Sequence, residues 1–246
     1  MDRSVYVAMT GATQTMRAQD AISNNLSNAS TMGFKSELNA FQSLPVMGDG
    51  QPTRVNAVAE GIGKDMAQGA SMQTGRPLDL AVKGDGWIAV QAPDGSEGYT
   101  RAGNLKLTAD GLLTDAAGHP VVGTSGPISL PDAGQISVGE DGTISSVPLG
   151  EGPNAIAALD RVKLVNPPSA ALAQGTDGLM HLAGGGQADA DPTVRVASGS
   201  LEGSNVNVSD ELVKMIALSR QYDMQVKTIK SAEDNAQSAT KLLQSN

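Results

Sequence analysis

Apolar residues recur at alternating spacings of four and three near the end of the chain. Most positions of this stripe are apolar, and it runs through Val208, Leu212, Met215, Ser219, Tyr222, Val226, Ile229, Glu233, Ala236, Thr240 and Leu243. Such spacing is typical of a coiled-coil stripe, and Ser209 followed by two acidic residues suits a helix start. The pattern predicts one helix over residues 209–243, about 50 Å long. A helix of that length needs a partner helix.

The N-terminal end offers such a partner. The same spacing links Val5, Ala8, Ala12, Thr15, Gln19, Ile22 and Leu26, which predicts a helix over residues 3–28. Its stripe has few large side chains, so the isolated helix would be marginal. We expect it to order against the C-terminal helix and neighbouring copies of the chain. An ordinary pair of helices packed inside a monomer would give the same pattern.

The middle of the chain predicts β structure. Short runs alternate apolar and polar residues, at 78–82, 88–90, 105–107, 162–164 and 194–196. Asp-Gly pairs, which favour tight hairpin turns, separate many of these runs, at 85–86, 94–95, 110–111, 141–142 and 177–178. No helical periodicity interrupts residues 78–147, so we expect a mostly antiparallel sandwich or irregular barrel rather than parallel crossovers.

These patterns together predict an α+β fold. The N- and C-terminal helices pair as a coiled-coil-like core domain, and the β domain lies between them in sequence. The expected parts are an N-terminal helix in 1–35, an extended connector in 36–75, the β domain in 76–204 and the C-terminal helix in 205–246.

Charge supports the same division. The chain carries a net charge of −9, and residues 36–204 hold nine basic and nineteen acidic side chains, so the excess lies in the middle. An acidic chain with 2% aromatic residues is a poor nucleic-acid partner. There is no cysteine, no apolar run long enough for a membrane span, and no apolar h-region in the first residues. We expect the acidic middle to face solvent and the neutral ends to make subunit contacts.

Catalytic chemistry has no support in the sequence. His119 lies in a turn and His181 in a short strand after a turn, places where a lone histidine is usually not catalytic. There is no G-x-S-x-G elbow, and the Gly63-Lys64 pair lacks the upstream glycine of a phosphate loop. We therefore expect no enzymatic activity, no metal and no cofactor.

Four sequence blocks together resemble the bacterial flagellar axial proteins, the family of rod, hook and hook-associated subunits. The first, SNNLSNASTMGFK, spans 23–35 and matches the family's Asn-Asn-Leu-(Ala/Ser)-Asn core and its Thr-x-Gly-Phe/Tyr-Lys end. The others are RPLDLAVKGDGW at 76–87, YTRAGN at 99–104 and GSLEGSNVN at 199–207 with the helix that follows. Tryptophan and isoleucine stand at 87–88 where paired phenylalanines are common. The start of the chain and its length look most like a proximal-rod subunit.

The resemblance implies a non-enzymatic structural subunit of the basal-body rod. Such subunits pass the flagellar type III export apparatus and polymerise helically in the periplasm. Their terminal helices form the part of the drive shaft that surrounds the export channel. The implied partners are copies of the chain and other rod subunits, without nucleic acid and without a membrane span. The alternative is a secreted β-domain binding module with a helical oligomerisation coil.

The asparagines of the first block suggest where subunits meet. Asn24 and Asn28 lie one helical turn apart, with Asn25 beside them. Leu26 can continue the apolar stripe while these amides face out of it and bond backbone groups of an adjoining subunit. A plain helix terminus is the alternative. Gly33 permits a sharp change of backbone direction, and Phe34 can anchor the departing chain. The predicted assembly residues also include Leu212, Met215, Ile216, Arg220, Tyr222, Val226 and Ile229.

Overall fold

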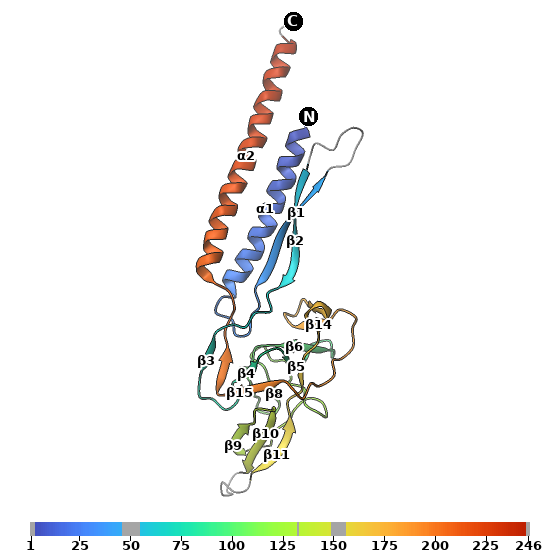
Figure 1. The fold of residues 1–246 in the computed structure, drawn as a ribbon, viewed down its shortest axis with the longest axis vertical. Helices are drawn as coiled ribbons and strands as arrows, with labels where there is room; N and C mark the ends of the chain where they lie inside the picture. The colour runs from blue at the N-terminus through green and yellow to red at the C-terminus, as the bar shows by residue number, and fades with distance from the viewer. Residues whose placement is uncertain (1–2, 46–54, 132, 149–155, 245–246) are drawn as a thin grey trace. The chain divides into compact units, whose positions relative to one another are not determined.

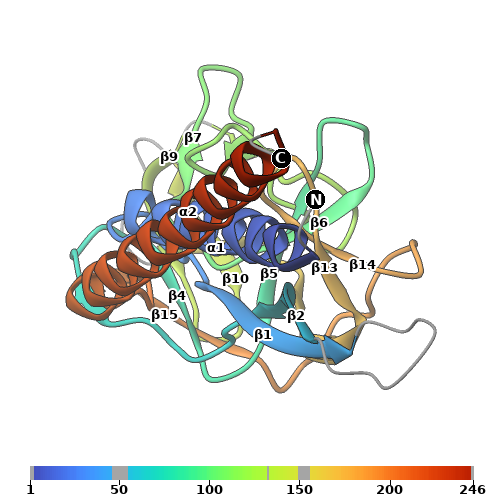
Figure 2. The same ribbon diagram turned by 90° about the horizontal axis from the view of Figure 1, so that it is seen from above.

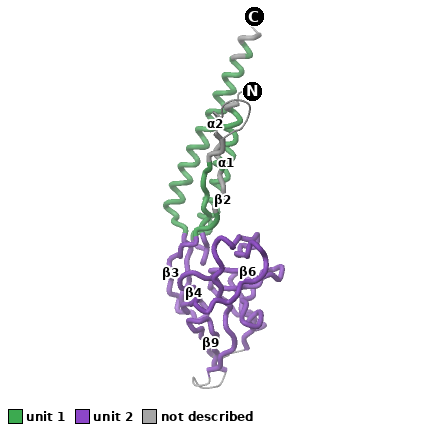
Figure 3. Tube along the Cα trace, turned by 45° about the vertical axis from the view of Figure 1, so that its right-hand side comes forward, with its two compact units in different colours: residues 1–29, 36–65, 206–246 green, residues 30–35, 66–205 purple. Residues whose placement is uncertain are grey.

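The chain folds into two compact units (Figure 3). The computed structural model describes residues 3–45, 55–131, 133–148 and 156–244. The helical unit comprises residues 1–29, 36–65 and 206–246, and the β unit comprises residues 30–35 and 66–205. Each unit therefore combines segments that are far apart in the sequence. The short segment 30–35 belongs to the β unit although helical-unit residues flank it on both sides.

The helical unit contains two helices and a hairpin. They are α1 (Arg3–Ser27), α2 (Val208–Gln244), β1 (Glu37–Pro45) and β2 (Val55–Lys64). The two strands pair antiparallel, and α1 lies between α2 and this hairpin (Figures 1 and 2). Both strands lie within the expected extended connector. Adjacent apolar residues, at 40–41 in β1 and 57–59 in β2, break the alternation of apolar and polar residues by which a strand is recognised in a sequence.

The two helices pack along a stripe that differs from the predicted one. Most of the less exposed side chains of α2 are at Glu211, Met215, Leu218, Tyr222, Gln225, Ile229 and Ala232. Leu218 and Met215 pack with Ala18 and Ile22 of α1. Met215, Tyr222 and Ile229 belong to both the predicted and the observed stripe. Leu212 and Val226 belong only to the predicted stripe and are exposed.

Small residues of α1 explain this register. A Cβ atom added at Gly11 would lie 2.8 Å from Nε2 of Gln225, so α2 comes close at this point. Thr15 is fully buried, and its hydroxyl donates to Oε1 of Gln225 at 3.2 Å. The apolar arc of α2 is broad enough for α1 to pack on the predicted stripe or on the observed one. The small residues of α1 favour the observed stripe, which places Gln225 in the contact between the helices.

The β unit is antiparallel, as predicted. Its largest sheet has the strand order β12-β5-β6-β14-β13, a second has β11-β10-β9, and the remaining strands form the pairs β15-β4, β16-β3 and β7-β8. The strands are β3 (Ser71–Gln73), β4 (Leu80–Lys83), β5 (Trp87–Gln91), β6 (Glu97–Thr100), β7 (Lys106–Leu107), β8 (Leu113–Thr114), β9 (Ala133–Val138), β10 (Thr143–Pro148), β11 (Ala157–Arg161), β12 (Leu164–Val165), β13 (Leu172–Gln174), β14 (Met180–Leu182), β15 (Arg195–Ser198) and β16 (Ser200–Glu202). A short 3-10 helix spans Ser169–Ala171. The α+β class is confirmed, whereas closure into a sandwich or a barrel stays a prediction.

Four of the five Asp-Gly pairs form turns between paired antiparallel strands, as the sequence predicts. The pair at 85–86 does not, because β4 and β5 lie in different sheets. The glycine of every predicted pair has a positive φ, between 78° and 136°, at Gly86, Gly95, Gly111, Gly142 and Gly178. In the turns at 94–95, 141–142 and 177–178, the aspartate accepts a hydrogen bond from the backbone N–H two residues later. The acidic residues of these turns therefore stabilise the backbone locally.

Candidate functional site

Asn25 lies in the contact between α1 and its neighbours, rather than facing out of it. Its side chain is 2% exposed. Oδ1 accepts a hydrogen bond from the N–H of Glu37 at 2.8 Å, and Nδ2 donates to the C=O of the same residue at 3.1 Å. Nδ2 also lies 3.4 Å from Oε2 of Glu211 in α2. The amide thus bonds the backbone of β1 as a neighbouring strand would. Its contacts link β1 and α2 to the end of α1.

The other two asparagines bond with each other at the surface. Nδ2 of Asn28 donates to Oδ1 of Asn24 at 2.8 Å and to the C=O of Asn24 at 3.0 Å. Asn24 is exposed and Asn28 half-buried, as is Leu26. These contacts stabilise the last turn of α1, which is the role expected for a helix terminus.

The predicted assembly residues of α2 fall into two groups. Met215, Tyr222 and Ile229 are half-buried on the stripe that includes the α1 contacts. Leu212, Ile216 and Val226 are exposed, as is Arg220. At 100° per residue these three apolar side chains lie on the arc next to that stripe. On α1, the large exposed apolar side chains are Tyr6, Met9 and Met16. The helical unit therefore presents apolar surface on both helices.

Gly33 and Phe34 lie in the β unit. Gly33 has a φ of 69°, which favours glycine. A Cβ atom at this position would lie 2.3 Å from the carbonyl carbon of Arg101. The Gly33 N–H donates to the C=O of Glu202 at 2.8 Å, and the C=O of Phe34 accepts from the N–H of Asn205. The predicted change of backbone direction at Gly33 is present, and it brings segment 30–35 against segment 202–205.

A buried ion cluster joins three of the sequence blocks. Nζ of Lys35 lies 2.7 Å from Oε1 of Glu202, and Nη1 of Arg101 lies 2.9 Å from Oε2 of the same carboxylate. All three side chains are at most 5% exposed. Two cations therefore share one anion in the interior of the β unit. We refer to Lys35, Arg101 and Glu202 as the ion cluster.

Further contacts hold each member of the ion cluster in place. Lys35 also donates to the C=O of Ala67 at 2.7 Å, and the N–H of Gly69 donates to Oε1 of Glu202 at 3.1 Å. Arg101 donates to the C=O of Gly84 at 2.9 Å, and its guanidinium carbon lies 5.4 Å from the ring centre of Trp87. This places a cation over an aromatic face.

The cluster lowers the pKa of the Glu202 carboxyl below its usual value. Burial alone would raise this pKa, but the hydrogen bond from Lys35 and the positive charge of Arg101 outweigh it. Glu202 is therefore ionised at neutral pH and offsets one of the two buried cations. All three residues lie within the sequence motifs, but the sequence does not indicate that they pair, because Arg101 and Lys35 are 101 and 167 positions away from Glu202.

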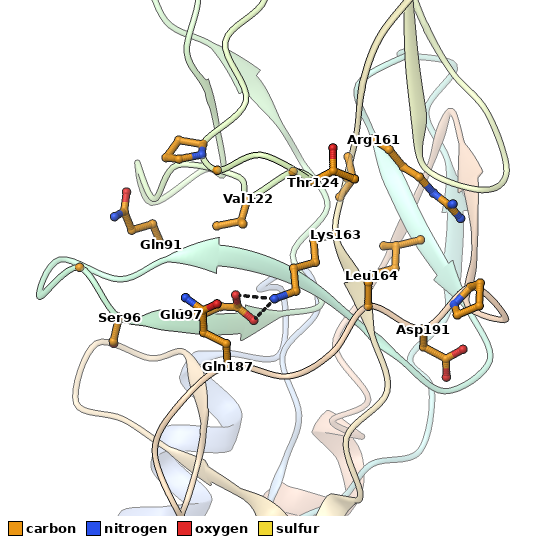
Figure 4. A pocket seen from close by; sticks show the side chains of 17 residues that line it. Gln91, Ser96, Glu97, Val122, Thr124, Arg161, Lys163, Leu164, Gln187 and Asp191 are labelled. Carbon is orange, nitrogen blue, oxygen red and sulfur yellow. Dashed lines mark hydrogen bonds and ion pairs between the residues drawn. The ribbon is translucent and has the colours of Figure 1, made fainter.

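A separate cavity of about 430 Å³ lies in the β unit (Figure 4). The Lys163 ammonium points toward the Glu97 carboxylate within it, with N–O distances of 2.7 and 3.0 Å. These two charges therefore compensate each other within the cavity. The two histidine rings also bond carboxylates, at Asp115 and Asp177. Within the described residues, no group of three or more His, Asp or Glu could hold a metal, and no helix could span a membrane.

Comparison with known proteins covers both the helices and the β region. The flagella basal body rod protein family matches residues 5–35, the flagellar hook protein FlgE/F/G D1 domain matches 81–146, and the flagellar basal body rod FlgEFG C-terminal family matches 197–242. The ion cluster draws Lys35 from the first of these ranges, Arg101 from the second and Glu202 from the third.

Full-length relatives agree with these matches. The flagellar basal-body rod protein FlgF of Escherichia coli is 45% identical, and that of Salmonella typhimurium 43%, each over 99% of both chains. The FlgF of Caulobacter vibrioides is 30% identical over 99% of this chain and 98% of its own. These matches favour a rod subunit over a secreted binding module. The chain therefore belongs to the flagellar basal-body rod proteins of the FlgF type, a structural and non-enzymatic family located in the rod of the basal body.

Proposed function

We propose that this rod subunit polymerises helically, with copies of itself and with other rod subunits, through α1 and α2. The helices thereby form part of the periplasmic drive shaft around the export channel. The subunit reaches this place through the flagellar type III export apparatus, as its family resemblance implies. The observation that carries the proposal is the exposed apolar surface on both helices.

The length of α2 supports the same proposal. It has 37 residues and α1 has 25, so α2 exceeds its partner by 12. Beyond Ala232, every α2 side chain that the structure describes is exposed. A helix of this length gains most of its stability from packing rather than from propensity. A neighbouring subunit would supply the missing packing surface.

The exposed arc of α2 gives the test. In the full-length chain, Ile216→Ser removes an apolar side chain that we expect a neighbour to cover. Covering an isoleucine is worth roughly 1.5–3 kcal/mol, so incorporation into purified basal bodies should fall at least about tenfold, with reduced swimming.

Ile156→Ser is the matched control. Ile156 is also well exposed but lies in the β unit, and its replacement should leave incorporation unchanged. Equal incorporation of both variants at the wild-type level would contradict the proposal. Far-UV circular dichroism verifies that both variants fold.

A further inference from the structure

Three methionines lie on the exposed faces of the helices. Met9 and Met16 of α1 are 56% and 51% exposed, and Met224 of α2 is 61% exposed. In contrast, Met180 is buried in the β unit and Met215 packs against α1. The thioether sulfur atoms of the first three are thus open to oxidants in the free subunit.

Their positions relate them to the apolar surface of the helical unit. Met9 and Met16 are seven residues apart, so they lie on one face of α1. At 100° per residue, that face is about half a turn away from Ala18, which contacts α2. Met224 likewise lies off the α2 stripe that includes Leu218. Among the described residues of the helical unit, these methionines are three of the eleven large apolar side chains that are exposed.

Oxidation would change the polarity of this surface without changing the fold. A peroxide transfers one oxygen atom to the sulfur, forming a sulfoxide, and is itself reduced to water. The sulfoxide oxygen is a polar acceptor that stays hydrated in the free subunit, because the side chain is exposed. When a neighbouring subunit buries this oxygen without offering a hydrogen-bond donor, the affinity between subunits falls about tenfold for each site.

We propose that Met9, Met16 and Met224 are oxidation sites that control whether the folded subunit can assemble. This inference rests on the proposed function, since it requires that neighbouring subunits cover these faces. In the assembled state the same contacts would protect the three sulfur atoms from oxidants.

The first test replaces the three methionines in the full-length chain. The triple variant Met9→Leu, Met16→Leu and Met224→Leu keeps the surface apolar and cannot be oxidised. The corresponding triple glutamine variant places a polar group of similar size there, as a sulfoxide does. We expect the leucine variant to enter basal bodies at the wild-type level and the glutamine variant at least tenfold less.

Met72→Gln is the matched control. Met72 is also exposed, but it lies in β3 of the β unit, so its replacement should leave incorporation unchanged. Equal incorporation of the leucine and glutamine triple variants would overturn the proposal, as would a loss with Met72→Gln of the same size.

The second test uses the oxidant. Mass spectrometry of the purified chain treated with hydrogen peroxide should show oxidation of the three helical methionines before Met180, with an unchanged far-UV circular dichroism spectrum. Cells that regrow flagella in peroxide should incorporate the wild-type chain at least tenfold less than the leucine variant. Equal sensitivity of the two chains would overturn the proposal.

The two proposals can fail separately. If Ile216→Ser blocks incorporation and the glutamine triple variant does not, the oxidation inference alone is wrong. If neither change affects incorporation, the proposed use of the helices for assembly fails as well.

Discussion

Replacing Glu202 with glutamine tests the ion cluster directly. Glu202→Gln keeps the size of the side chain and an oxygen that can accept from Gly69. It removes the negative charge that Lys35 and Arg101 share. The two cations, which lie 2.7 and 2.9 Å from the carboxylate oxygens in the wild-type chain, then remain buried without an anion.

The expected cost follows from this burial. Removing one partner of a buried ion pair destabilises a protein by about 3–5 kcal/mol, because it leaves an uncompensated buried charge. In a unit of this size, each kcal/mol lowers the thermal midpoint by about 2–4 °C. The midpoint of the β unit should therefore fall by about 10 °C.

Fluorescence of Trp87 provides the assay. It is the only tryptophan of the chain and lies under the Arg101 guanidinium, so its emission reports on the β unit and on the cluster. Glu140→Gln is the control, because Glu140 pairs with Lys83 at the surface, where both side chains are at least half exposed. That variant should leave the midpoint unchanged. If Glu202→Gln has no more effect than Glu140→Gln, the cluster does not stabilise the β unit.

The pH dependence of the same variant gives a second check. The pKa of Glu202 is lower in the folded chain than its ordinary value of 4.5. The unfolded state therefore binds more protons on this group, and stability from the carboxylate is present above the unfolded pKa. It is lost as the pH falls through the folded pKa. The difference in midpoint between wild type and Glu202→Gln should be largest near neutral pH and shrink below pH 4.5.

Three further predictions concern single segments. In urea unfolding, Gly33→Ala should lower the free energy of unfolding by roughly 2 kcal/mol more than Gly75→Ala. Both glycines have similar positive φ values, but only an added Cβ at Gly33 would meet a neighbour, the Arg101 carbonyl. Equal losses would refute the steric argument. In thermal unfolding, Asn25→Leu should lower the free energy of unfolding of the helical unit by about 2 kcal/mol, because it loses both hydrogen bonds to Glu37, whereas Asn24→Leu at the surface should not; the reverse order would contradict the assignment. A fragment of residues 66–205 lacks Lys35, so Glu202→Gln should destabilise it less than it destabilises the full chain; an equal or larger loss would show that Lys35 makes no contribution.

Periodicity predicted both helices well, and each of the five predicted strand runs overlaps a strand of the β unit, at β4, β5, β7, β12 and β15. The other nine strands described in that unit fall outside these runs. The C-terminal helix was expected over 209–243 and spans Val208–Gln244, and the N-terminal one was expected over 3–28 and spans Arg3–Ser27. These segments are long and strongly periodic, so a few ambiguous residues do not change the result. The predicted stripe on α2 is one residue off at alternate positions, because the face of α2 that meets α1 depends on where α1 has small residues. Spacing along α2 carries no such information.

The candidate site was only partly accessible from the sequence. Leu212 and Val226 lie on the predicted apolar stripe, and Ile216 belongs to the block that resembles the C-terminal segment of the rod proteins. All three are exposed, and their role in assembly stays a prediction. The role of Asn25 was not identified, because its partner Glu37 lies beyond the helix end in a hairpin that the sequence did not indicate. The ion cluster was missed for the same reason, since charges pair by distance in space and not along the chain.

The resemblance blocks and the proposed assembly surface place different demands on the sequence. At Gly103 in the third block, an added Cβ atom would lie 1.7 Å from the carbonyl oxygen of Leu80, and Gly33 has a similar restriction. Arg101 and Glu202 each need a specific charge and hydrogen-bond geometry. Such positions tolerate few residue types, so they form recognisable motifs. An apolar contact through Ile216 or Met9 needs only area and could be made by several side chains. The motifs of this chain therefore include residues that the interior of the β unit requires, while apolar spacing along the helices indicates only candidates for the proposed assembly surface.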